Sequence, residues 1–471
     1  MLHVSTRGEA PALSFSDALL TGLARDGGLY LPQSWPTLSS PEIAGFAGKP
    51  YTAVAERVLG ALSDGDIESG ALSGMVGQAY AGFRHPAVCP LTQIGDNLFV
   101  LELFHGPTLA FKDVAMQLLG RLMDHVLGQR GQRATIVGAT SGDTGGAAID
   151  AFKGLKSVDV FILYPHGRVS DVQRRQMTTV DAPNVHAIAV EGTFDDCQNL
   201  VKAMFNHHAF RDEIGLSGVN SINWARIAAQ VVYYFTSAVS LGGPGRKVSF
   251  TVPTGNFGDI LAGWVAKQMG LPIERLTIAT NSNDILARTL ASGVYEMRGV
   301  HATTSPSMDI QISSNFERLL FEAYGRDGAA VRRLMQSLQQ SGRFEIAAEP
   351  LARIRSEFDA AALSEAEISA EIRETWTESG YLLDPHTAIG VGAARQKLSR
   401  DPATPMIVLG TAHPAKFPAA VKAASGVEPG LPAHLADLME RVERVTLLPN
   451  DLGKVETFVR EHARAVRGAA A

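Results

Sequence analysis

The amino-acid sequence contains only two cysteines and no long apolar run. Cys89 and Cys197 lie far apart, without CxxC or histidine-rich spacing, so they indicate two reduced thiols and neither a disulfide framework nor a metal site. The N-terminus lacks the basic and apolar regions of a secretory signal, and no run of about 18 apolar residues occurs. These absences argue against a membrane-spanning chain and favour a cytoplasmic location.

An excess of basic residues is also absent. The net charge is −6, so the overall charge does not predict nucleic acid or an anionic membrane as a partner. Hydrophobic residues make up 45% of the 471 residues and charged residues 19%, a balance typical of a globular enzyme. A chain about three times as long as a typical domain is expected to form two or three domains.

Strands and helices are predicted to alternate from about residue 90. Short β-branched runs indicate buried strands, and each but the last is followed by turn residues and an amphipathic stretch. The predicted strands are residues 134–137, 158–163, 185–190, 248–252, 276–279 and 406–409. Repeated strand, loop and helix units imply mainly parallel sheets, with ligands bound where loops leave the carboxyl ends of strands. We therefore predict an α/β fold.

Segments outside this alternation suggest the domain boundaries. Residues 1–88 are mainly helical, interrupted by a turn-rich piece at 26–32, and are predicted to form a separate N-terminal domain. The α/β region is placed at 89–465, as two interleaved subdomains. Within it, residues 345–378 are rich in Ala and Glu with helical periodicity and predict a helical insertion. Residues 466–471 are predicted to form a flexible tail.

A lysine stands at the start of a predicted helix. Turn residues in the segment 104–111 lead into a stretch whose apolar residues recur every three or four positions, and this stripe puts Lys112 on the inward side. Burial and the positive end of the helix dipole both disfavour an ammonium group, which makes Lys112 a candidate nucleophile toward an aldehyde. The alternative is a lysine whose side chain extends along the helix to water.

Two loops rich in glycine and hydroxyl groups follow predicted strands. In the segment 138–146, free amides and hydroxyls at a helix N-terminus can bind a carboxylate or phosphate. The alternative is that Ser141 or Asp143 simply caps the helix. The segment 254–259 repeats the arrangement and predicts a second anion site. Neither loop has a Walker or GxGxxG motif, which argues against a generic nucleotide-binding enzyme.

A third polar cluster precedes another apolar helix. Asn220, Ser221 and Arg226 combine amide, hydroxyl and guanidinium groups, which suit the capture of a phosphate. The alternative is that Arg226 forms an ion pair at the surface or between domains. Thr411 places one more hydroxyl just past the strand predicted at 406–409.

Taken in this order, the segments resemble the threonine synthases over nearly the whole chain. These are fold-type II enzymes that depend on pyridoxal 5′-phosphate, and the resemblance implies two parallel-sheet α/β domains with a mainly helical N-terminal domain. The chain is most similar to their longer, microbial and fungal branch. The motifs that carry the resemblance are Ser5-Thr6-Arg7-Gly8, Asp26-Gly27-Gly28, the lysine segment 104–113, Ser141-Gly142-Asp143-Thr144-Gly145, Ser221-Ile222-Asn223-Trp224-Ala225-Arg226, Gly255-Asn256-Phe257-Gly258 and Asp384-Pro385-His386-Thr387-Ala388.

The resemblance implies a set of cofactor contacts. Lys112 would hold pyridoxal 5′-phosphate as a Schiff base and move protons once the substrate amine has displaced it. Thr411 would face the pyridine nitrogen, where a neutral hydroxyl favours elimination and replacement over transamination. The helix dipole would help to bind the cofactor phosphate, and the carboxylate of Asp259 should point away. The residues implied to hold that phosphate are Gly255, Asn256, Phe257, Gly258 and the backbone amide of Asp259.

The resemblance also implies where the substrate carboxylate binds. The loop with Thr140, Ser141 and Thr144 would take this group, with Asp143 near the phenolic oxygen of the cofactor. Many fold-type II enzymes have asparagine at the position of Asp143. This departure leaves the protonation state of that contact open.

The substrate implied by the resemblance is O-phospho-L-homoserine. Its phosphate would bind Asn220, Ser221 and Arg226 and leave by γ-elimination, after which water adds at Cβ to give L-threonine. The resemblance further implies a monomer, with a dimer as the alternative. Competing functions are a phospholyase or dehydratase that releases a 2-oxo acid, and a binding protein without turnover. The phosphate cluster argues against the dehydratase, and intact Lys112 argues against the binding protein.

Overall fold

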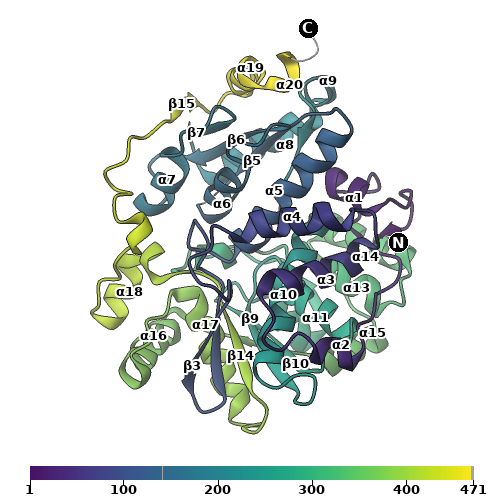
Figure 1. The fold of residues 1–471 in the computed structure, drawn as a ribbon, viewed down its shortest axis with the longest axis vertical. Coiled ribbons are helices and arrows are strands. Elements are labelled where there is room, and N and C mark those ends of the chain that lie inside the picture. The colour runs from purple at the N-terminus through teal and green to yellow at the C-terminus, as the bar shows by residue number, and fades with distance from the viewer. Residues whose placement is uncertain (141, 468–471) are drawn as a thin grey trace.

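The computed structural model describes residues 1–140 and 142–467, which form two large sheets, beside two short strand pairs, with helices packed around them (Figure 1). Ser141 and residues 468–471, most of the predicted tail, lie outside the described residues. Both sheets are almost entirely parallel, as the alternation of strands and helices predicts.

The larger sheet has six strands in the order β13-β10-β9-β14-β4-β3. Its strands are β3 (Leu91–Gly95), β4 (Leu98–Glu102), β9 (Val248–Pro253), β10 (Ile273–Thr280), β13 (Phe358–Ala362) and β14 (Met406–Gly410). Only the pair β3 and β4 is antiparallel. The three strands predicted in this part of the chain are confirmed as β9, β10 and β14, whereas the other three were not predicted.

The smaller sheet has five parallel strands in the order β15-β7-β6-β5-β8. Its strands are β5 (Ala134–Ala139), β6 (Val158–Pro165), β7 (Val185–Glu191), β8 (Leu216–Ser217) and β15 (Thr446–Pro449). The C-terminal segment returns to this sheet, with α19 (Leu452–His462) and α20 (Arg464–Arg467) beside it (Figure 1). The Arg464 guanidinium donates to the buried Asp159 carboxylate at 2.6 Å and anchors this end of the described chain.

Two helices in the interior connect the sheets. α5 (Lys112–Gln129) and α10 (Trp224–Ser240) contact each other and are buried on nearly every side, which their apolar composition favours. The other helices of the α/β region are α6 (Asp143–Phe152), α7 (Asp171–Thr178), α8 (Phe194–Asn206), α9 (His208–Glu213), α11 (Gly258–Gln268), α12 (Ile285–Ser292), α13 (Phe316–Ala323), α14 (Gly328–Ser341), α17 (Pro385–Leu398) and α18 (Pro418–Ser425). Of the helices within residues 1–140 and 142–467, none is long and apolar enough to cross a bilayer.

The N-terminal segment is mainly helical, with one short antiparallel strand pair. Its elements are β1 (His3–Ser5), α1 (Phe15–Thr21), β2 (Tyr30–Pro32), α2 (Ser40–Ala44), α3 (Tyr51–Ser63) and α4 (Ser69–Tyr80). α3 packs on α10 and α4 on α5, so their apolar faces join the same hydrophobic core as the α/β region. The division of the chain at residue 88 stays a prediction.

The prediction of a helical insertion at 345–378 is wrong for the middle of this segment, which forms a strand. α15 (Ala348–Glu357) and α16 (Glu365–Ser379) form as predicted, but β13 lies between them and pairs in parallel with β10. The open edge of β10 offers backbone partners, and Phe358 packs on Phe257 with ring centroids 5.8 Å apart. These tertiary contacts outweigh the helix propensity of the alanines in β13. β11 (Val294–Glu296) and β12 (Arg343–Glu345), which α13 and α14 separate in the chain, form a short antiparallel pair.

Candidate active site

Lys112 begins α5 just beyond the carboxyl end of β4, and its side chain is buried. Only 8% of the residue is exposed, so the alternative of a side chain that reaches water is wrong. Burial lowers the pKa of Lys112, the charges of Lys416 and Arg226 add to this effect, and Asp143 opposes it. Its Nζ lies 4.8 Å from the centre of the Phe111 ring. The site therefore contains an amine with a reduced preference for its charged form.

Thr411 lies next to the start of α5. The amide of Phe111 donates to the Thr411 carbonyl at 2.9 Å, and Ala110 pairs with Ala412 in an isolated β-bridge. The Thr411 amide in turn donates to Thr387 Oγ1 at 3.2 Å, at the first turn of α17. The structure thus brings the backbone of Thr411 beside the residues that precede Lys112, although the sequence predicts one after a strand and the other at the start of a helix.

The loop after β5 is organised by Thr140. Its Oγ1 accepts hydrogen bonds from the amides of Gly142 and Gly145, each at 3.0 Å. Gly142 has φ 147°, a conformation that favours glycine, and a Cβ there would lie 2.4 Å from the Gln173 side chain. Thr144 lies half-buried in the first turn of α6. Of the predicted residues in this loop, Ser141 lies outside the described part of the chain.

Asp143 does not cap α6, so that alternative is wrong. The cap position is occupied by Gly142, and the buried Asp143 carboxylate lies 3.5 Å from Lys112 Nζ and 2.8 Å from Lys416 Nζ. Burial disfavours the carboxylate, but the charges of Lys416 and Lys112 outweigh burial and hold the pKa of Asp143 below its usual value. The structure therefore favours an ionised Asp143.

The loop after β9 has the geometry of an anion site. Phe257 stands at the N-cap of α11 with φ 62°, and a Cβ on Gly255 would lie 2.9 Å from the Ser307 carbonyl oxygen. Among the described residues, no acceptor is found for the amides of residues 255–259. Free amides at a helix N-terminus are the arrangement that binds a phosphate.

The carboxylate of Asp259 points away from this loop, as predicted. It accepts hydrogen bonds from the hydroxyls of Tyr233 and Tyr234 on α10. Its Oδ2 is buried and finds no partner among the described residues. Burial raises the pKa of Asp259 to about 7, although the two tyrosines lower it.

Replacing Asp259 with asparagine is expected to change how stability depends on pH. The raised pKa means that the folded protein keeps a proton on Asp259 that the unfolded chain releases near pH 3.8. Binding of this proton stabilises the fold fully below pH 3.8, and the stabilisation is lost as the pH rises through about 7. Between pH 4 and 7, the free energy of unfolding of the wild type should fall relative to Asp259→Asn by about 1.4 kcal/mol per pH unit. Urea unfolding of the ligand-free proteins across this range measures the difference. If the free energies of unfolding of the two proteins changed in parallel with pH, the raised pKa of Asp259 would be contradicted.

The third cluster contains a buried arginine without an anion partner. Arg226 in the first turn of α10 is 5% exposed, and its Nη1 donates to the Val219 carbonyl at 3.0 Å. Within residues 1–140 and 142–467, no carboxylate pairs with Arg226, so the alternative of an ion pair is not supported in this part of the chain. Burial lowers the pKa of Arg226 to about 10. Asn220 is exposed and Ser221 is half-buried, both on the loop that leads to α10.

Asn315 and Arg318, which the sequence analysis missed, connect this cluster to the loop after β9. Asn315 Nδ2 donates to the carbonyls of Ser221 and Asn256 at 3.1 and 3.0 Å. The buried guanidinium of Arg318 donates to Asn315 and to backbone carbonyls of the N-terminal segment and the Ser221 loop. Neither residue stands in a glycine-rich motif, so the sequence offered no local signal for them.

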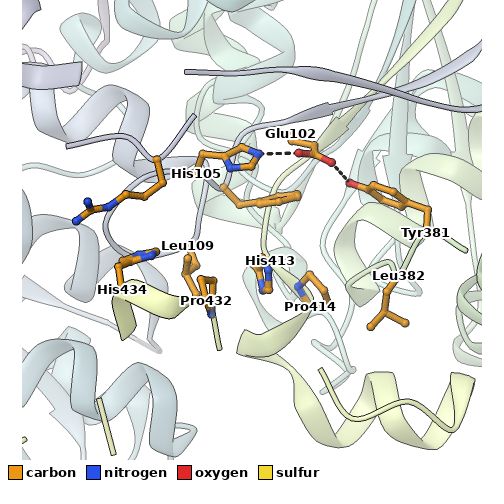
Figure 2. A pocket seen from close by; sticks show the side chains of 11 residues that line it. Glu102, His105, Leu109, Tyr381, Leu382, His413, Pro414, Pro432 and His434 are labelled. Atoms are coloured by element: carbon orange, nitrogen blue, oxygen red, sulfur yellow. Dashed lines mark hydrogen bonds and ion pairs between the residues drawn. The ribbon is translucent and has the colours of Figure 1, made fainter. Parts of the chain in front are cut away.

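A cavity of about 370 Å³ borders the segments that contain Lys112 and Thr411 (Figure 2). Leu109 and His413, which precede Lys112 and follow Thr411 by a few residues, lie in its wall. The Glu102 carboxylate is hydrogen-bonded to His105 at 2.6 Å and to the Tyr381 hydroxyl at 2.9 Å, as Figure 2 shows. The lining contains none of the predicted site residues, so this cavity neighbours the predicted site and does not define it.

Family profiles match almost the whole chain. Residues 2–80 match "Threonine synthase N terminus", residues 88–409 match "Pyridoxal-phosphate dependent enzyme", and residues 387–459 match "Threonine synthase, C-terminal". The central match contains the lysine and all three polar clusters described above.

Relatives of similar length are named threonine synthase. A threonine synthase of Pseudomonas aeruginosa is 54% identical over 463 residues, which cover 98% of each chain. The crystal structure of a threonine synthase from Brucella melitensis with bound pyridoxal phosphate is 66% identical, with a TM-score of 0.97 over 98% of this chain and 100% of that one. The yeast threonine synthase structure is 41% identical, with a TM-score of 0.94 over 98% of both chains. The chain belongs to the threonine synthase family of pyridoxal-phosphate-dependent enzymes.

Proposed function

We propose that this protein converts O-phospho-L-homoserine and water to L-threonine and phosphate, with pyridoxal 5′-phosphate attached to Lys112. The observation that carries the proposal is the position of Lys112. Its buried Nζ lies 3.5 Å from Asp143, at the start of a helix that contacts α10. Arg226 lies on α10, buried and without a carboxylate partner among the described residues. Together they offer a nucleophilic amine and a cation for a phosphorylated substrate.

The residues present fit the cofactor. The amides of residues 255–259 would hold its phosphate, since they lack acceptors among the described residues and lie at the N-terminus of α11. Lys112 would bind its aldehyde carbon, and the cofactor would supply the electron sink for cleavage of bonds next to the amino group. Thr411, next to the start of α5, would offer a neutral hydroxyl to the pyridine nitrogen.

The substrate would be bound at both ends. The amides and hydroxyls of the loop containing Thr140, Ser141 and Thr144 would receive the α-carboxylate. Asn220, Ser221 and Arg226 would receive the phosphate, which would give the buried guanidinium the counterion that it lacks among the described residues. Asn315 supports the proposal because it bridges the loops with Ser221 and Asn256, the two proposed phosphate sites, through hydrogen bonds to both.

Replacing Gly255 with alanine is expected to weaken binding of the cofactor about tenfold or more. The new Cβ would lie 2.9 Å from the Ser307 carbonyl oxygen, and displacing the loop would misalign its amides. Titration of the cofactor-free protein with pyridoxal 5′-phosphate gives the dissociation constants. Gly60→Ala on α3 is a matched control because nothing lies within 4 Å of its Cβ position. Equal affinity of Gly255→Ala and wild type would remove this loop from the cofactor site.

The reaction itself is tested by measuring two products together. Phosphate and threonine should appear in equal amounts when the holoenzyme receives O-phospho-L-homoserine. Phosphate accompanied by 2-oxobutyrate would identify a phospholyase, and no phosphate release would contradict both functions. The cytoplasmic location and the monomeric state remain predictions, of which size-exclusion chromatography tests the second.

A further inference from the structure

Lys416 is a fully buried lysine for which the reaction proposed above has no role. It follows β14 in a single 3-10 turn and is 0% exposed. Its Nζ lies 2.8 Å from Asp143 Oδ1 and donates to the Thr108 carbonyl at 2.7 Å and to Gln176 Oε1 at 3.1 Å. An ammonium group has three donors and no acceptor, so the surroundings of Lys416 match its charged form completely.

The three partners of Lys416 come from different parts of the fold. Thr108 belongs to the loop that leads to Lys112, and its amide and hydroxyl are held by the Asp113 carboxylate at 2.7 and 2.6 Å. Asp143 begins α6, and Gln176 lies on α7, both of which accompany the smaller sheet. Lys416 follows a strand of the larger sheet, so its ammonium group connects the two sheets at the candidate active site.

Asp143 therefore lies between two lysines, with unequal contacts. Its Oδ1 is held at 2.8 Å by Lys416 and at 2.9 Å by Gln173 Nε2, whereas its other oxygen lies 3.5 Å from Lys112. The closer lysine is Lys416, which the proposed reaction does not use. The farther one is the proposed catalytic amine, whose charge must change during the reaction.

We propose that Lys416 is a positioning residue whose ammonium group, by its contact with Asp143, keeps that carboxylate ionised and directed at Lys112, so that Asp143 does not take up the proton that Lys112 loses. A buried carboxylate whose only cation becomes neutral would otherwise take up a proton. The charged groups around Asp143 and Lys112 are Lys416 after β14, Arg226 on α10 and Asp259 on α11. Asp113 on α5 acts on Lys416 and holds Thr108, whose carbonyl accepts from Lys416 Nζ. The inference deepens the proposed role of Asp143 and rests on it.

The protonation state of Asp143 can be observed without cofactor or turnover. In cofactor-free Lys112→Met protein labelled with ¹³C at the aspartate carboxyl carbons, the Asp143 resonance is identified by its loss in Lys112→Met/Asp143→Asn. We expect this resonance to remain that of a carboxylate from pH 8 down to about pH 4, the ordinary range of an aspartate. A titration midpoint near or above pH 6 would overturn the proposal, since Lys416 would then be insufficient.

A second variant separates the charge of Lys416 from its packing. In Lys112→Met/Lys416→Met, the side chain of Lys416 is replaced by one of similar length, and the Asp143 midpoint should rise by about two units or more because burial is no longer opposed. Lys112→Met/Lys422→Met is the matched control, since Lys422 lies on α18 with 60% of its side chain exposed. An unchanged midpoint in the first double variant would overturn the proposal and reduce Lys416 to a structural contact. If Lys112→Met/Lys416→Met does not fold, the titration of Asp143 in Lys112→Met alone tests the proposal. Both results are independent of whether the enzyme makes threonine.

Discussion

Lys112→Ala is expected to lower turnover of O-phospho-L-homoserine by about 10⁴-fold, because the variant lacks both the covalent anchor and the group that moves protons. The visible absorption band that the cofactor has when bound to a lysine should disappear with it. The fold should persist, since the substitution removes a buried amine whose charge is opposed by burial. Phosphate release and the absorption spectrum measure the two effects, and circular dichroism reports the fold.

An exposed lysine provides the control for this result. Lys247 pairs with Glu274 at the surface, with 66% of its side chain exposed, and Lys247→Ala should keep both the band and the activity. A Lys112→Ala protein that retained the band would show that another amine holds the cofactor. In that case, the assignment of Lys112 as the lysine that binds the cofactor would be wrong.

Arg226→Met is expected to stabilise the ligand-free protein and to impair the enzyme. The wild-type guanidinium is buried with no carboxylate partner among the described residues, so replacing it with an apolar side chain should raise the free energy of unfolding by roughly 1 to 4 kcal/mol. Loss of a buried charge-assisted contact with the substrate phosphate should lower kcat/KM by about 10² to 10³-fold. Urea unfolding and steady-state kinetics measure the two changes.

The opposite signs of these effects make the prediction specific. If Arg226 had a purely structural role, the protein would lose stability when it is substituted. The absorption band of the bound cofactor should be intact whichever role Arg226 has. Arg226→Lys keeps the charge but not the planar pair of donors, so its activity should fall between those of wild type and Arg226→Met. A destabilised Arg226→Met protein with normal kcat/KM would rule out the phosphate contact.

Local sequence patterns were enough to predict the parallel sheets and the loops that end their strands. Apolar runs such as 248–252 predict buried strands, and the glycines that follow them permit tight loops at helix N-termini. Because the carboxyl ends of parallel strands gather at one edge, the same patterns indicated where ligands bind. Lys112 was recognisable for a related reason, since the stripe of α5 determines which side of the helix it occupies.

Contacts between distant segments decided what the local patterns could not. The alanines of β13 favour a helix in isolation and become a strand only because β10 has an open edge and Phe257 offers a surface for Phe358. Lys416 is separated from Asp143 by more than half of the chain, and Asn315 from Ser221 by 94 residues. Sequence alone determined the class of the fold and the inward side of α5 on which Lys112 lies, because both depend on periodicity within single elements. The charges and hydrogen bonds around that lysine depend on which elements meet, and only the tertiary structure decided that.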